Sequence, residues 1–109
     1  MNIIAITACP TGIAHTYMAK KALEDAAKSL GHKIKVETQG AAGIENKLSK
    51  TDVKEADILI LAVGISISEK ARFNDIRKVE IPVETAIKSA NAVIKKIERK
   101  LKETKWKRF

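Results

Sequence analysis

Residues 2–8 read NIIAITA, a short and nearly continuous apolar run that is followed directly by the turn signal Pro10-Thr11-Gly12. Such a run is typical of a strand that is buried on both faces of a sheet. Apolar residues then recur at helical spacing from residue 13 to residue 30, and Gly31 supplies a stop signal. The start of the chain therefore predicts a buried strand, a tight turn and a helix that packs on the sheet.

Three further strands are expected, at residues 33–38, 57–63 and 77–81. The first alternates strictly between polar and apolar residues, which predicts a half-exposed strand at a sheet edge, whereas the second, DILILAV, predicts an interior strand. One short helical turn is expected near residues 52–55, and Pro82 opens a long amphipathic helix. This alternation indicates an α/β fold: a small doubly wound, Rossmann-like, four-stranded parallel sheet with helices on both faces.

The composition limits the classes of protein that fit. A chain of 109 residues with 45% hydrophobic residues is the size of one domain, which we expect to span residues 1–104, followed by a basic tail at residues 105–109. The net charge of +8 makes acidic partners plausible. No apolar run is long enough to span a membrane and no leader pattern opens the chain, so we expect a cytoplasmic protein without direct membrane insertion.

The cysteine and histidine counts restrict the chemistry further. Cys9 is the single cysteine, so the chain cannot form an internal disulfide or assemble a thiolate metal cluster. The two histidines have no ligand cluster around them, and His32, beside Gly31, is expected to be a solvated turn residue. We therefore expect neither a metal nor a cofactor.

The segment TACPTGIAHT, residues 7–16, carries the most information about function. It places a thiol between a buried strand and the first turn of a helix, where backbone N–H groups lack intrahelical partners and Gly12 permits close approach of the backbone. This arrangement predicts a loop that cradles a phosphoryl group and favours the thiolate form of Cys9, a ready nucleophile. The alternative is that Cys9 is a small buried hydrophobic residue, which its position in the loop makes the weaker interpretation.

Other polar residues of this segment each have two interpretations. His15 follows Cys9 by six residues, where Cys-based phosphatases carry their phosphate-binding arginine. It either donates a hydrogen bond to a phosphoryl oxygen or is a first-turn histidine bonded to backbone or water. Thr11 and Thr16 either donate hydroxyl groups to the anion or cap the helix, and Pro10 stiffens the turn.

Two classes of protein with different functions are to be weighed for this chain. A Cys-dependent phosphatase shares the strand, loop and helix, but it needs an arginine where this chain has His15, and an aspartate as general acid. A basic interaction module would bind nucleic acid or an anionic membrane through residues 95–109, which hold eight Lys or Arg against two Glu. That module leaves the Cys9 loop unexplained, and the few aromatic residues offer little for base stacking, so we expect no nucleic-acid partner.

Several motifs together resemble one known family. They are ITACPTGIAHTYMA at residues 6–19, VETQG at 36–40, GIEN at 43–46 and ADILIL at 56–61. These motifs are similar to the fructose-specific enzyme IIB domain family of the bacterial phosphoenolpyruvate-dependent sugar phosphotransferase system, the PTS. The similarity runs through residues 2 to about 63, and Arg72-Phe73 resembles the family's Arg-Phe element.

The resemblance implies a phosphotransferase. In that family, the motif cysteine accepts phosphate from a phosphohistidine of the IIA component and donates it to fructose held by the membrane IIC component, giving fructose 1-phosphate. Cys9 is then the phosphocysteine, and the partners are phosphorylated IIA, IIC and fructose or a related sugar. The chain would be transiently at the inner face of the membrane.

The candidate site residues follow from the loop and from the resemblance. Cys9 is the expected catalytic residue. The expected phosphate-binding loop consists of Pro10, Thr11, Gly12, Ile13, Ala14, His15 and Thr16. Gln39, Gly40 and Arg72 are further candidates, and Arg72 would reach either the phosphoryl site or a partner, or would be a plain surface arginine.

Overall fold

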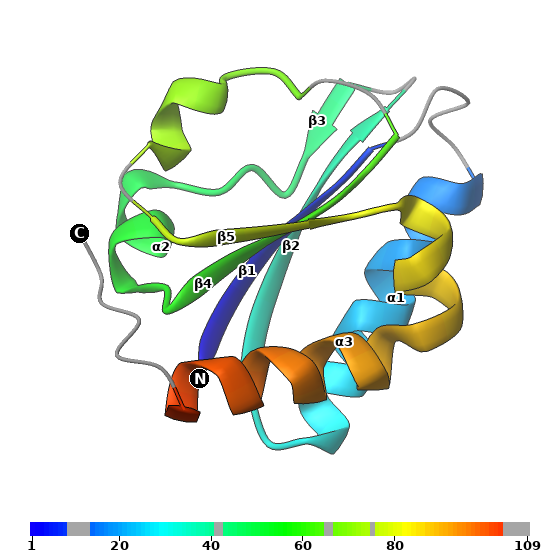
Figure 1. Ribbon diagram of the computed structural model, residues 1–109. Coiled ribbons are helices and arrows are strands. Elements are labelled where there is room, and N and C mark those ends of the chain that lie inside the picture. The colour runs from blue at the N-terminus through cyan, green and yellow to red at the C-terminus, as the bar shows by residue number, and fades with distance from the viewer. Residues whose placement is uncertain (9–13, 41–42, 65–66, 75, 104–109) are drawn as a thin grey trace.

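The computed structural model describes residues 1–8, 14–40, 43–64, 67–74 and 76–103 (Figure 1). Strands and helices alternate through most of this chain, as the sequence pattern predicts. In chain order the elements are β1 (Asn2–Ala8), α1 (Ala14–Ser29), β2 (Lys33–Gly40), β3 (Gly43–Glu45), α2 (Lys50–Glu55), β4 (Ile58–Val63), the short 3-10 helix η1 (Lys70–Phe73), β5 (Lys78–Ile81) and α3 (Val83–Glu103).

The strands form one five-stranded sheet in the order β3-β2-β1-β4-β5. β1, β2, β4 and β5 pair in parallel, whereas β3 pairs antiparallel with β2. The prediction of four parallel strands is therefore confirmed, but it missed β3. The placement of β2 at a sheet edge is wrong, because β3 covers its outer side. The strand order reverses at β1, which gives the doubly wound topology in which ligands bind beyond the carboxyl ends of the strands.

Helices cover both faces of the sheet, as expected (Figure 1). α1 and α3 pack on one face over a core that includes Ile3, Ala5 and Leu23. α2 and η1 lie on the other face over a second core that includes Ile4 and Ile6. Successive side chains of β1 thus enter opposite cores, which explains why its sequence is an unbroken apolar run.

The ends of the helices follow from local sequence. α1 is followed by Gly31 at φ 81°, a left-handed conformation that glycine adopts without a steric penalty. Ser49 caps α2 in a capping box, in which its side chain accepts from the Asp52 amide and the Asp52 carboxylate accepts from the Ser49 amide. α3 begins directly after Pro82, as predicted, and its backbone departs from helical angles at Ser89.

His32 is not the solvated turn residue that the sequence suggested. Its side chain is 11% exposed, with Nδ1 3.0 Å from the Met1 amino group and Nε2 3.0 Å from Glu98 Oε2 on α3. The imidazole thus joins the start of β1 to the last helix. A pattern of local turn residues cannot reveal this contact, because both partners are distant in sequence.

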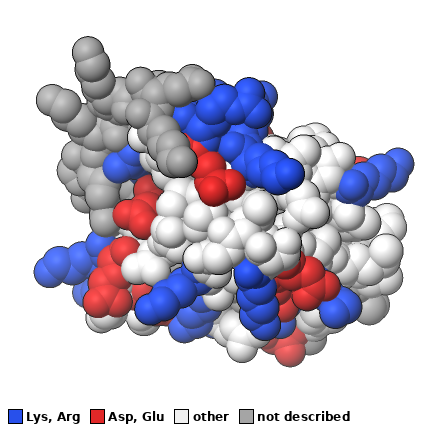
Figure 2. Space-filling model, turned by 90° about the horizontal axis from the view of Figure 1, so that it is seen from below, with Lys and Arg blue, Asp and Glu red and all other residues white. Residues whose placement is uncertain are grey.

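The surface at this end of the molecule is mixed in charge. Seen from below Figure 1, the side on which the N-terminus lies, basic and acidic side chains are interspersed (Figure 2). Among the described residues, no helix is long and apolar enough to cross a membrane. The expected basic tail lies outside the described residues.

Candidate functional site

The frame of the site is the carboxyl end of β1. Ala8, the last residue of this strand, lies in register with Gln39 of β2 on one side and Val63 of β4 on the other. The Gly64 amide also donates to the Ala8 carbonyl oxygen at 2.8 Å. Cys9, Pro10, Thr11, Gly12 and Ile13 lie outside the described residues, between Ala8 and the first residue of α1. The chain therefore enters this segment from the centre of the sheet, at the topological switch point.

The start of α1 is tied directly to the end of β1. Thr7 is fully buried, and its Oγ1 donates to the backbone carbonyl of Thr16 at 3.1 Å. The Tyr17 hydroxyl donates to Glu45 of β3, and this bond raises the pKa of the phenol above its ordinary value. The first turn of the helix is thus fixed beside the strand end, which is the arrangement that an anion cradle requires.

Ala14, His15 and Thr16 form the first turn of α1. Ala14 and His15 are exposed, whereas Thr16 is buried. The role of His15 in phosphoryl binding stays a prediction. Thr16 contributes its carbonyl to the tie with Thr7.

Replacing Thr7 by valine is expected to lower the free energy of unfolding by about 1 kcal/mol, because the branched shape is kept and one buried hydrogen bond is lost. Urea denaturation measures this difference. Thr38 provides a matched control, since it lies opposite Thr7 in β2 and its buried Oγ1 has no hydrogen-bond partner among the described residues. Thr38→Val should be neutral or stabilising, and an equal loss in both variants would contradict the role of the Thr7 hydroxyl.

On the face of the sheet opposite α1, a side chain of β2 makes hydrogen bonds to the backbone of the segment that follows β4. Gln39 is 7% exposed, and its Oε1 accepts from the Ser68 amide at 2.8 Å while its Nε2 donates to the Ser68 carbonyl at 3.3 Å. Gly40, the last residue of β2, pairs with Gly43 of β3. Gln39 is therefore beside Ala8 in the sheet and holds the backbone of another loop, which the sequence alone did not indicate.

Arg72 is placed deep in the same region and is not a plain surface arginine. Its side chain is 16% exposed, and its guanidinium makes a two-pronged ion pair with Glu37, with Nη1 2.8 Å from Oε1 and Nη2 3.0 Å from Oε2. Glu37 is fully buried. Sequence analysis missed Glu37 because it has the same strand parity as the exposed Lys33 and Lys35, which predicts a solvent-facing side chain.

Hydrogen bonding sets the ionisation of Glu37. Burial alone would raise the pKa of this carboxyl, but the bonds from Arg72, Gln39 and the Leu48 amide hold its pKa below the ordinary value. The ion pair in turn raises the pKa of Arg72. Both groups are therefore charged at neutral pH, and the buried carboxylate is fully engaged by donors.

Comparison with known proteins identifies the class of protein to which this chain belongs. The family model described as PTS system, Lactose/Cellobiose specific IIB subunit, matches residues 4–96. A solution structure of the Enzyme IIB subunit of a PTS system from Escherichia coli K12 has a TM-score of 0.88 and 44% identity, covering 93% of this chain and 94% of that one.

Two relatives from Escherichia coli strain K12 narrow the class. The PTS system fructose-like EIIB component 2 is 50% identical over 103 residues, which is 94% of this chain and 97% of the relative. The fructose-like PTS system EIIBC component is 48% identical over 89% of this chain, and the match occupies 20% of that relative. The chain therefore belongs to the fructose-like family of PTS EIIB components, which take part in sugar phosphotransfer.

Proposed function

We propose that Cys9 accepts a phosphoryl group from a phosphohistidine of a IIA component and passes it to fructose held by a membrane IIC component, giving fructose 1-phosphate. The observation that carries this proposal is the position of the only cysteine. Cys9 directly follows the last residue of β1 at the switch point of the sheet, and α1 begins at Ala14. Strand, short loop and helix start together form the usual setting for binding a phosphoryl anion.

Two displacements at phosphorus account for the transfer. The Cys9 thiolate attacks the phosphoryl group of phosphohistidine, the S–P bond forms, and the P–N bond breaks with its electron pair left on the imidazole. A sugar hydroxyl oxygen then attacks the same phosphorus, the O–P bond forms, and the S–P bond breaks to regenerate the thiolate. The hydroxyl proton goes to a base at the sugar site. No oxidant, reductant or metal is required for this balance.

The residues around Cys9 have supporting roles in this proposal. Thr11, Gly12 and Ile13, with the first turn of α1, supply backbone N–H groups to the phosphoryl oxygens, and Pro10, which has no backbone N–H, stiffens the turn. The positive end of α1 also favours the thiolate over the thiol. Thr7 supports the cradle by fixing the helix start against β1. We place the domain at residues 1–104 with a basic tail after it, in the cytoplasm and transiently at the inner membrane face, where IIC would receive the phosphoryl group.

A carrier and a phosphatase share the first displacement and differ in the second. A phosphatase activates water with a general acid and clamps the transition state with a bidentate arginine. In this chain His15 stands where that arginine would be, and one imidazole donor does not reproduce the two-pronged clamp. The phosphorylated protein should therefore keep its phosphoryl group until a sugar arrives.

The test is to phosphorylate the protein with radiolabelled phosphoenolpyruvate, the general PTS proteins and a fructose-type IIA component, and then to remove the donors. Addition of fructose and membranes containing IIC should move the label to sugar, with little free phosphate when either is omitted. A reaction without IIA is the control and should leave the protein unlabelled. Release of phosphate at catalytic rates without sugar would make the protein a hydrolase and overturn the proposal.

A further inference from the structure

We propose that Glu37 and Arg72 are positioning residues for phosphoryl transfer, which hold residues 67–74 as a wall beside the carboxyl end of β1, the strand that Cys9 follows in the sequence, on the face of the sheet opposite α1. In this proposal Arg72 does not bind the phosphoryl group. The inference rests on the proposed function of Cys9 and extends it to a part of the chain far from the loop in sequence.

The path of the chain follows from the strand order. β1 lies between β2 and β4, so a loop that leaves the end of β4 and contacts β2 passes the end of β1. Residues 67–74 follow β4 and contact β2 through Ser68 and Arg72. η1, within this segment, lies on the same side of the sheet as α2, away from α1 and α3 (Figure 1). The end of β1 is therefore flanked by the α1 start on one face and by this segment on the other.

Glu37 anchors the segment to β2 through both carboxylate oxygens. Oε1 accepts from Arg72 Nη1 and from the Leu48 amide, each at 2.8 Å. Oε2 accepts from Arg72 Nη2 at 3.0 Å and from Gln39 Nε2 at 2.7 Å. A buried carboxylate is costly unless its lone pairs are satisfied, and these four donors satisfy them in one geometry. The position of Arg72 relative to β2 is fixed accordingly.

Arg72 also donates hydrogen bonds to the backbone of two loops. Its Nη1 donates to the Leu48 carbonyl at 3.1 Å, and its Nε donates to the Glu69 carbonyl at 3.0 Å. Glu69 has φ 57°, a left-handed conformation that costs a non-glycine residue of the order of 1 kcal/mol and persists only where neighbours hold it. The guanidinium also lies 4.6 Å from the centre of the Phe73 ring. A planar fork can make this set of bonds, whereas the point charge of lysine cannot.

Gln39 connects this wall to Ala8, the residue that precedes Cys9 in the sequence. Gln39 lies directly beside Ala8, the residue before Cys9, and it holds the Ser68 backbone by two hydrogen bonds. A shift of residues 67–74 would therefore displace Gln39 and its neighbour Ala8, which directly precedes the proposed nucleophile. Displacements of about 1 Å at a site that depends on alignment can slow a reaction by about a hundredfold.

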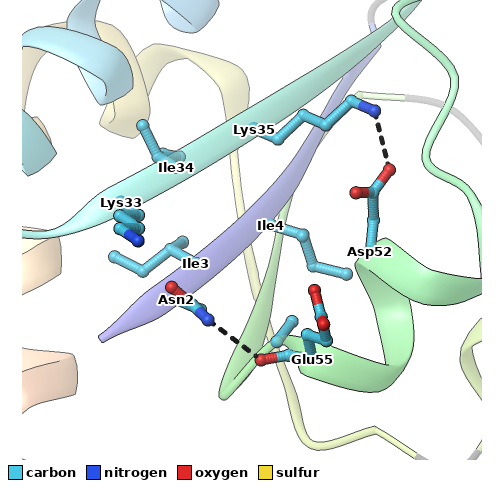
Figure 3. A pocket seen from close by; sticks show the side chains of 9 residues that line it. Asn2, Ile3, Ile4, Lys33, Ile34, Lys35, Asp52 and Glu55 are labelled. Atoms are coloured by element: carbon cyan, nitrogen blue, oxygen red, sulfur yellow. Dashed lines mark hydrogen bonds and ion pairs between the residues drawn. The ribbon is translucent and has the colours of Figure 1, made fainter.

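The test compares Arg72→Lys with a matched control on β2, the strand that carries its partner Glu37. Lys35 shares the strand and the parity of Glu37 and makes an ion pair with Asp52 at 2.7 Å, but this pair lies beside a pocket toward the start of β2 (Figure 3). Lys35→Met therefore breaks an ion pair on the same face without touching residues 67–74. Single-turnover phosphoryl gain from phosphorylated IIA should slow by about 10- to 100-fold in Arg72→Lys and stay within about twofold of wild type in Lys35→Met.

The readouts separate positioning from simple loss of stability and from docking. The rates are measured well below the midpoint of thermal unfolding of each variant, across a range of IIA concentrations. A slower maximal rate at saturating IIA supports positioning, whereas an unchanged maximal rate with weaker saturation makes Arg72 a partner contact and overturns the proposal. If Arg72→Lys does not fold, Gln39→Met carries the test, because it loosens Ser68 and removes one donor to Glu37 but keeps both hydrogen bonds between Glu37 and Arg72. Its maximal rate should also fall, by less than that of Arg72→Lys.

Failure of this proposal is distinguishable from failure of the proposed function. If wild-type protein gains no phosphoryl group from any fructose-type IIA component, the role of Cys9 is wrong. If wild type is phosphorylated and the folded Arg72→Lys variant reacts at the rate of Lys35→Met, Cys9 keeps its role and the positioning role of Glu37 and Arg72 is wrong.

Discussion

The Cys9→Ser variant is expected to gain no stable phosphoryl group from phosphorylated IIA, while its fold is unchanged. Cys9 is the only thiol in the chain, and a thiolate forms near neutral pH, whereas a serine hydroxyl stays protonated unless a base activates it. The substitution exchanges one small side chain for another, so the loss should be chemical. Intact-mass measurement after incubation with the phosphoryl donors checks the result, and circular dichroism checks the fold.

The two histidines are the controls for this prediction, since the proposed donor carries its phosphoryl group on a histidine. His15 is exposed in the first turn of α1, and His32 is enclosed between Met1 and Glu98 at the other end of β1. His15→Gln and His32→Gln should both still be phosphorylated. A stable phosphoryl group on Cys9→Ser, mapped to either histidine, would show that the acceptor had been assigned to the wrong residue.

The elements that sequence predicted well are those fixed by local periodicity. Residues 2–8 enter two cores through alternate side chains, and this double burial is visible as an apolar run. β3 was missed because three residues are too short to show a period, and it exists through pairing with β2. The misplacement of β2 at a sheet edge follows from the same omission. Exposed and partly buried residues alternate only at the start of β2, and the residues that follow are buried.

The candidate site also contains residues that stand together in the sequence and residues that meet only in the fold. The anion-binding role of residues 9–16 stays a prediction, and it rests on residue types that suit an anion and stand together in the chain. Glu37 and Arg72 meet across 35 positions, so no local pattern records their pairing. Lys33 and Lys35 suggested that Glu37 would face solvent, and segments that arrive later in the sequence, at Leu48 and Arg72, bury it instead.

The Glu37→Leu variant is expected to lose about 3–5 kcal/mol of the free energy of unfolding at neutral pH, because removing one partner of a buried pair leaves an uncompensated charge on Arg72. The Leu48 amide also loses its acceptor. Urea denaturation of the variant and of wild type measures the difference. The double variant Glu37→Leu/Arg72→Met should recover about half or more of the loss, since apolar replacement of a whole buried pair is often neutral. It should not recover the rate of phosphoryl gain.

The same difference in stability should depend on pH with a defined sign. The pKa of Glu37 is lowered in the folded protein, so its stabilising contribution is present above the unfolded value of about 4.3 and is lost as pH falls through the lower folded value. The gap between wild type and Glu37→Leu should therefore be largest near pH 7 and should shrink below about pH 4. Asp52, whose pKa the Lys35 bond lowers, contributes equally to both proteins and cancels in the comparison. A gap that stays constant with pH would mean that the stability comes from packing at this position, and the ion pair would then not be the element that holds residues 67–74.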